Sequence, residues 1–171
     1  MYARIAIVHS KCAAPALKPT RAVAARQPES PMAKMRHIAI SVKDPEAAAR
    51  FFEQAFGMTR AGKAMRGVYM TDGVINIALL NFGDEPVPGF ETQKGYEGLI
   101  HFGMWVDDVE EADRKVKEAG GSYMAGRHEK DPNVFYEVKY KTPEGIVFDI
   151  TQNGWKGAVK DVVPAKSGRA A

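Results

Sequence analysis

The chain has 171 residues, of which 45% are hydrophobic, enough for one compact domain with a substantial core. Its formal net charge of +3 arises in residues 1–31, which hold five basic residues against one acid, while the remainder carries a net charge of −1. This balance excludes a basic stripe for nucleic acid, and the single Cys12 excludes an intramolecular disulfide or a cysteine-rich metal site. A lone cysteine also fits the reducing conditions of the cytoplasm, where we expect the protein to reside.

Residues 1–33 form a leader that we expect to be disordered. Its apolar run at residues 5–8 is far too short for a membrane span or a signal peptide, so no membrane partner is expected. The composition, rich in Ala, Arg and Pro and poor in acids, leaves a transit peptide as one alternative. Another, which we favour, is that translation begins at Met32 or Met35.

Residues 37–57 and 101–121 repeat one another at a constant offset of 64 positions. Eight of the 21 positions are identical, whereas random matching would give about one or two. Each segment begins with a histidine, His37 in the first and His101 in the second. The chain therefore holds two copies of a unit in which a strand precedes a helix, and the histidine is part of what is duplicated.

In the first unit, alternating apolar residues predict a strand over residues 35–42, and a helix follows it. Asp44 can cap that helix, Pro45 suits its first turn, and Gly57 is suited to end it. The apolar face predicted for the helix comprises Ala48, Phe51, Phe52, Ala55 and Phe56. Three further strands are expected, over residues 58–64, 67–71 and 74–81.

The second unit repeats this order after a polar linker that contains Gly and Pro. Residues 99–106 predict a strand, and Asp108 with Glu111 has the spacing of a capping box at the start of a helix. The remaining strands are expected over residues 122–126, 134–141 and 146–152.

Each unit is thus β-α-β-β-β, and the fold class is α+β. We place one domain at residues 34–153, with module one at residues 35–82, the linker at residues 83–98 and module two at residues 99–153. Residues 154–171 follow as a tail, in which Trp155 is expected to anchor against the body or a second subunit.

The alternation of the strands turns both histidines away from the helices. In the first unit Ile38, Ile40 and Val42 form the richer apolar face, which the helix must cover, so His37 points into the space that the sheets enclose. Ile100, Phe102, Met104 and Val106 place His101 in the same way. On the last strand Asp149 points inward too. Two imidazoles and a carboxylate suit a divalent first-row metal with open coordination positions, although each residue alone also fits a hydrogen-bonded core position.

Other side chains are expected to surround this cluster. Glu137 and Lys139 face the cavity beside Asp149 if the alternate residues of their strand face the helix, and they are the candidates for moving protons; an exposed edge strand with solvated charges is the alternative. Ile75, Ile77 and Leu79 are expected to form an apolar wall for the substrate, with Asn81 further along. Trp105 either stacks on the substrate or plugs the cup.

These features resemble the vicinal-oxygen-chelate superfamily, which includes glyoxalase I, extradiol dioxygenases, methylmalonyl-CoA epimerase and the bleomycin-resistance proteins. The resemblance rests on the paired units, the inward histidine of each, and Asp149 after the TPEG turn, and it covers residues 35–153. It implies a cupped, barrel-like mixed sheet, the glyoxalase-like fold, that holds one divalent metal ion (Fe, Mn, Ni or Zn). The implied ligands are His37, His101 and Asp149, on which a substrate chelates through two adjacent oxygens.

Four positions depart from patterns within that superfamily. Asp149 stands where the extradiol enzymes usually have a glutamate, which is longer by one methylene. The internal repeat puts Ile77 opposite Asp149, where some members have a fourth ligand, so three protein ligands are expected here. Ser41 stands where glutathione-dependent glyoxalases tend to carry an arginine, and Lys139 where extradiol enzymes generally have a tyrosine.

Two functional classes fit these residues. Retention of both histidines and the acid favours a metal-dependent enzyme that carries out lyase, isomerase or dioxygenase chemistry on a small molecule. The alternative is a metal-free module of the bleomycin-resistance type that binds a small molecule, and a scaffold with a filled cup is a third possibility. The sequence leaves open whether the two units close within one chain or exchange with a second subunit in a homodimer.

Overall fold

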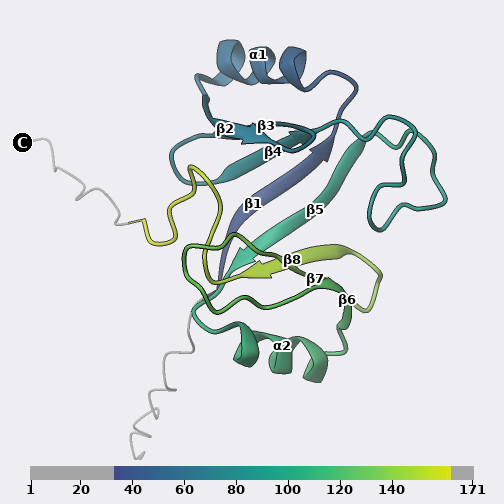
Figure 1. Cartoon of the computed structure of the whole chain (residues 1–171), viewed down its shortest axis with the longest axis vertical. Coiled ribbons are helices and arrows are strands. Elements are labelled where there is room, and N and C mark those ends of the chain that lie inside the picture. Colours follow the sequence, from purple (N-terminus) through teal and green to yellow (C-terminus); the bar gives the residue numbers. More distant parts are fainter. Residues whose placement is uncertain (1–32, 163–171) are drawn as a thin grey trace, which may run out of the picture.

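The computed structural model describes residues 33–162, so the expectations for the leader and for the far end of the tail lie outside the described residues. Eight strands and two helices occur in this range (Figure 1). In chain order they are β1 (Lys34–Ser41), α1 (Pro45–Phe56), β2 (Thr59–Ala64), β3 (Gly67–Thr71), β4 (Asn76–Leu80), β5 (Gly98–Trp105), α2 (Val109–Glu118), β6 (Ser122–Gly126), β7 (Val138–Lys141) and β8 (Val147–Thr151).

The strands form one mixed sheet in the order β2-β3-β4-β1-β5-β8-β7-β6. β1 and β5 pair antiparallel at its centre, while β1 with β4 and β5 with β8 pair in parallel. Figure 1 shows α1 and α2 at opposite ends of the molecule, each packed on the half of the sheet that belongs to its own unit. The α+β class and the duplicated β-α-β-β-β unit are confirmed, and the two units pair within one chain.

Both helices begin where the sequence predicts. The Asp44 side chain accepts hydrogen bonds from the amides of Glu46 and Ala47, each 2.9 Å long, and Gly57 ends α1 with a φ of 65°. The Asp108 side chain accepts from the Glu111 amide, but the Glu111 carboxylate pairs with Lys115, so the capping box is only half formed. With 12 and 10 residues, neither helix in the described range is long enough to cross a membrane.

Each helix covers a separate cluster of buried side chains. Ala49, Met58, Val68, Met70, Ile77 and Leu79 lie under α1, and Val106, Val109, Tyr136, Val138, Tyr140, Phe148 and Ile150 lie under α2. The face predicted for α1 is partly wrong, because Phe51 and Phe56 are 57% and 67% exposed while Ala49 is fully buried. The small Ala49 lets the helix approach the sheet on that side, and the two phenylalanines contact Phe52 at its outer edge.

Part of the linker between the units packs onto the inner face of the sheet. Val87 is 1% exposed and joins Ala39, Ala78 and Ile100 in a third buried cluster. Ile100 reaches this face because β1 pairs Ile40 with Leu99 and Ala39 with His101, which leaves Ile100 as an extra residue in a β-bulge. The prediction that Ile100 faces the helix is therefore wrong.

The strand expected over residues 134–141 is shorter than predicted, because β7 begins only at Val138. The preceding segment is held by a side chain instead of a neighbouring strand: Asn153 Nδ2 donates to the carbonyls of Asp131 and Val134. Glu137 is therefore the last residue of the loop that precedes β7.

Tyr140→Phe should destabilise the fold by about 1 kcal/mol, because the buried hydroxyl donates a 2.6 Å hydrogen bond to Asp113 Oδ1. Lys117 and then Tyr140 lower the pKa of Asp113, so the stabilisation of its charged form exists above the ordinary carboxyl range and is lost as pH falls through the lowered pKa. Urea unfolding at neutral and acidic pH measures the free energy of unfolding of the unmodified chain and of Tyr140→Phe. The difference between these two free energies should be smaller in acid. Tyr123→Phe, which removes an exposed hydroxyl, is the matched control, and an equal loss in both variants would contradict the assignment.

Candidate functional site

The central strand pair brings the two duplicated histidines together. In the antiparallel register of β1 and β5, His37 lies opposite Gly103 and His101 opposite Ala39, so the two imidazoles are diagonal neighbours on the inner face. Their ring centroids are 5.3 Å apart, and the residues are 2% and 7% exposed. The expectation that both rings point away from the helices and meet agrees with this geometry.

Asn76 determines which nitrogen of His37 carries the proton. The Asn76 Nδ2 group donates to the Lys156 carbonyl at 2.7 Å, which directs its Oδ1 atom to His37 Nδ1, also at 2.7 Å. Because Oδ1 can only accept, His37 must be protonated on Nδ1. The lone pair of Nε2 is then free and faces Glu137, whose Oε1 atom is 3.9 Å away. Asn76 lies beside His37 in the β1–β4 register, and sequence reasoning missed it.

Glu137, Lys139 and Asp149 lie beside the two rings. Lys139 Nζ is 2.6 Å from Asp149 Oδ2 and 3.2 Å from Glu137 Oε2, so one ammonium group links the two carboxylates. His101 Nε2 is 3.1 Å from the same Asp149 Oδ2, but the direction does not suit a hydrogen bond. Both ring nitrogens of His101 and Asp149 Oδ1 are therefore buried without hydrogen-bond partners among the described residues.

Burial sets the protonation states of this cluster. It lowers the pKa of His37, and together with Lys139 it lowers the pKa of His101 to about 3, so both rings are neutral. Burial alone raises the pKa of Glu137, but the Lys139 ammonium group, with the hydrogen bond from Trp155, outweighs burial and lowers the pKa to about 2. Burial and then the neighbouring Glu137 raise the pKa of Asp149 to about 8. Burial lowers the pKa of Lys139, but Asp149 and Glu137 outweigh this effect, so the pKa of Lys139 is raised above its ordinary value.

Trp155, from the segment after β8, belongs to the site. Its indole ring is stacked on His37 with centroids 4.9 Å apart and planes 5° from parallel, and its Nε1 donates to Glu137 Oε1 at 2.7 Å. Gly103 makes room for it, since a Cβ atom there would lie 2.5 Å from the indole and 2.8 Å from the His37 Cβ. The small residue two positions after His101 therefore accommodates a side chain of this chain. No local pattern in the sequence indicates that contact.

The segment that carries Trp155 is fixed across the inner face of the first unit. Thr71 Oγ1 donates to the Gly157 carbonyl at 2.6 Å, and the Val159 amide donates to the Val74 carbonyl at 3.0 Å. Within the described residues the beginning of the expected tail is thus part of the folded body, and Trp155 packs against its own chain.

Three side chains predicted to bind substrate lie elsewhere. Ile77 is in the core under α1, because the register of β4 with β1 turns Asn76 and Ala78 to the inner face instead. Asn81 is exposed; its side chain donates to the Lys43 carbonyl and accepts from the Gly83 amide, which fixes a turn. Trp105 donates to the Gln152 carbonyl at 2.6 Å and packs against Gly154. The apolar wall expected from β4 is therefore absent from the described inner face.

The donors present fit a divalent cation. His37, His101 and Glu137 each offer a ligand atom, and these atoms all lie within 4.8 Å of one another. Two neutral imidazoles and a carboxylate suit first-row metals, and the buried nitrogens of His101 have no other partner in the described range. The site forms entirely within one chain.

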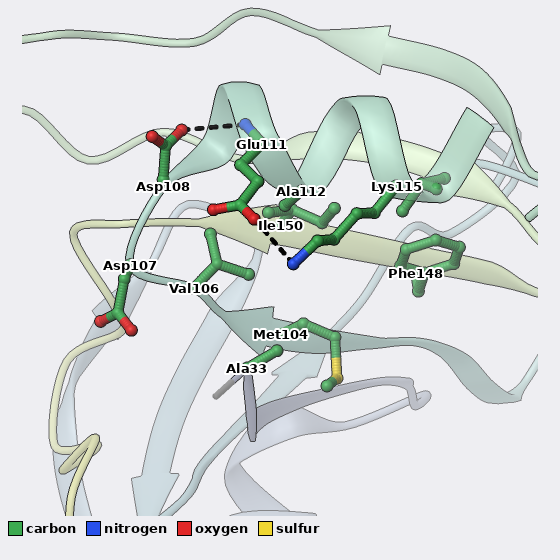
Figure 2. A pocket seen from close by; sticks show the side chains of 11 residues that line it. Ala33, Met104, Val106, Asp107, Asp108, Glu111, Ala112, Lys115, Phe148 and Ile150 are labelled. Carbon is green, nitrogen blue, oxygen red and sulfur yellow. Dashed lines mark hydrogen bonds and ion pairs between the residues drawn. The ribbon is translucent and has the colours of Figure 1, made fainter. Parts of the chain in front are cut away.

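Two hollows flank the sheet on opposite sides. One, of about 460 Å³, is lined by Trp155, Tyr69, Lys63 and Lys156, among others, and meets the cluster through Trp155, which contacts His37 and Glu137. The other, of about 240 Å³, lies on the helix side between α2 and strands β5 and β8 and is mostly apolar (Figure 2). No residue of the site, Trp155 included, lines this second hollow, so it is separate from the candidate site.

Comparisons with known proteins agree with this geometry. The model of the Glyoxalase/Bleomycin resistance protein/Dioxygenase superfamily matches residues 34–150. An uncharacterized protein of Bacillus subtilis is 29% identical over 119 residues, which are 66% of this chain and 91% of that protein.

Solved structures show the same fold at low sequence identity. A hypothetical protein from Bacillus halodurans is 20% identical with a TM-score of 0.56, over 69% of this chain and 92% of its own. Methylmalonyl-CoA epimerase from Mycobacterium tuberculosis is 16% identical with a TM-score of 0.55, over 72% and 90%. The Mn(II)-bound glyoxalase from Novosphingobium aromaticivorans is 16% identical with a TM-score of 0.53, over 79% of this chain and 44% of its own.

His37 is expected to be the Nδ1-protonated tautomer across neutral pH, because Asn76 offers it only an acceptor and burial lowers its pKa. Long-range ¹H–¹⁵N correlation spectra of the imidazole nitrogens measure this directly. The partly exposed His128 provides an internal comparison. A proton on His37 Nε2 would contradict the orientation assigned to Asn76.

Proposed function

Because the chain belongs to the Glyoxalase/Bleomycin resistance protein/Dioxygenase superfamily, we propose that it is a divalent-metal-dependent enzyme acting on a small oxygenated molecule. The observation that carries this proposal is the convergence of two buried, neutral imidazoles with a carboxylate inside one chain. A bound divalent ion would act there as a Lewis acid on substrate oxygens.

The residues of the chain suit proton-transfer chemistry of the lyase or isomerase kind. Lys139 lies between two acids and can hold a proton or pass it between them. Tyr69 on β3 lines the cavity beside Trp155. Dioxygenase chemistry is the second candidate within the enzyme class. It is supported by the same set of two histidines and one carboxylate.

The cavity favours a substrate with an anionic group. Lys63 and Lys156 contribute two ammonium groups to its wall, Asn133 and Asn153 contribute amides, and Trp155 and Phe135 provide apolar surface. A carboxylate on the substrate would be drawn to the lysines while its apolar part contacts Trp155 and Phe135. We therefore propose a small oxygenated carboxylic acid as the substrate class.

A metal-free binding module is the alternative, and one observation favours it. Lys139 already supplies a positive charge between Glu137 and Asp149, which lets both carboxylates be buried without a metal ion. A site of that kind would bind a small molecule in the cavity beside Trp155 and perform no metal-assisted reaction.

The purified protein should bind about one equivalent of Mn(II), Ni(II), Zn(II) or anaerobic Fe(II), because its donors converge on one position. His37→Ala and His101→Ala should each lower the bound metal to roughly a tenth or less, as expected when one of few ligands is lost. Elemental analysis after desalting and isothermal titration calorimetry measure both quantities.

The control for this experiment is His128→Ala, which removes an imidazole outside the cluster and should leave metal binding unchanged. Failure of the unmodified chain to retain any of the four metals would favour the metal-free module. Loaded protein can then be compared for isomerase or lyase turnover of 2-oxo and 2-hydroxy acids and for O₂ uptake with catechols.

Lys156→Gln should weaken binding of small 2-hydroxy or 2-oxo carboxylates by roughly tenfold, since a charge-assisted contact is lost. Tryptophan fluorescence is a direct readout, because Trp155 lines the same cavity. Lys94→Gln, an exposed lysine of the linker, is the matched control. Equal binding of the methyl esters of these acids would contradict an anionic substrate.

A further inference from the structure

We infer that Glu137, and not Asp149, supplies the carboxylate of the metal centre, and that Lys139 keeps Asp149 out of the ligand set. This inference rests on the proposed function, because it concerns which residues hold the proposed ion. It reverses the roles that strand alternation indicates, in which Asp149 is the ligand and Glu137 is free to move protons.

Position separates the two carboxylates. Glu137 has an oxygen within 4.8 Å of ligand nitrogens on both His37 and His101, so the three donors surround a single point. Asp149 approaches only the His101 side, with its Oδ2 atom 3.1 Å from Nε2, and it does not join the group that contains His37. A cation held by both imidazoles is therefore offered the Glu137 carboxylate.

The surroundings of Glu137 are those of an oriented ligand. Trp155 Nε1 donates to its Oε1 atom at 2.7 Å, and Lys139 Nζ approaches its Oε2 atom at 3.2 Å. Metal-binding carboxylates and histidines usually have such outer partners, which fix their direction. His37 has one too, in Asn76. Two of the three proposed ligands are thus already oriented by neighbouring side chains of this chain.

Asp149 is engaged in a different way. Its Oδ2 atom accepts the shorter of the two Lys139 contacts, at 2.6 Å, and the residue is fully buried on the central part of β8. Removing that oxygen from the ammonium group would leave a fully buried polar atom without its hydrogen-bond partner, which is unfavourable. The aspartate side chain is also one methylene shorter than that of glutamate. Lys139 is therefore a positioning residue: it holds Asp149 in a hydrogen bond and leaves Glu137 to bind the metal.

Glu137→Gln and Asp149→Asn test the inference as a matched pair, because each replaces one buried carboxyl group by an amide with little change of shape. Titration calorimetry with Mn(II) and Zn(II) should show affinity falling at least about tenfold in Glu137→Gln and less than about threefold in Asp149→Asn. The Mn(II) electron paramagnetic resonance spectrum reports the coordination sphere without any need for turnover, and it should change only in Glu137→Gln.

Lys139→Met supplies a third variant. It frees Asp149 from the ammonium group, so Asp149 becomes available to the ion, and the Mn(II) spectrum should change while metal is still retained. Near-ultraviolet circular dichroism and urea unfolding show whether each variant keeps the native fold. If either amide variant is not folded, it is replaced by Glu137→Asp, which shortens the side chain, or by Asp149→Glu, which lengthens it, and only the change at residue 137 should alter the spectrum.

The outcomes separate this inference from the proposed function. If Asp149→Asn loses metal and Glu137→Gln retains it, the inference is wrong and the metal-dependent function stands. Equal losses in both would also overturn it, since both acids would then be ligands. If the unmodified chain binds none of the metals, the proposed function fails first.

Discussion

The antiparallel pairing of β1 with β5 is the interaction on which the site depends. It joins the two units into one sheet, and its register sets His37 opposite Gly103 and His101 opposite Ala39. If the register of β1 or β5 shifted by one residue, the histidine of the shifted strand would point into the core under its helix. Because the hydrophobic faces of both strands are buried by their own helices, such a shift would also expose those faces. The packing of the helices therefore fixes the position of the histidines.

Burying two acids beside two imidazoles requires internal compensation. Lys139 provides it, since its ammonium group contacts Glu137 and Asp149 together. The same arrangement would hold the cluster together in the absence of a metal ion and orient Glu137 in its presence. Charge balance and ligand geometry thus depend on one side chain, and this is why the metal-dependent and the metal-free functions share the same residues.

The sequence predicts the features that depend on short-range rules. Spacing and alternation predict the repeat, the two helices with their caps at Asp44 and Asp108, and the inward direction of the histidines on β1 and β5. The predictions are wrong where contacts between segments far apart in the sequence determine which way a side chain points. The inner face of β4 is set by its pairing with β1, which turns Asn76 inward and Ile77 to the core, and alternation within β4 alone cannot establish that phase. The contact of Trp155 with Glu137 links β7 to the segment beyond β8, and no local signal predicts it.

The two units have diverged at the point where their symmetry would matter most. In the first, the residue beside the histidine in the parallel register is Asn76, which satisfies His37 Nδ1. In the second, Asp149 lies beside Gly103, two residues further along, and leaves both nitrogens of His101 without a hydrogen bond in the described structure. A buried imidazole with no partner is unfavourable unless something else satisfies it. The buried polar atoms without hydrogen bonds therefore lie on the His101 side of the site, next to the two acids. A cation bound there would be stabilised by these atoms.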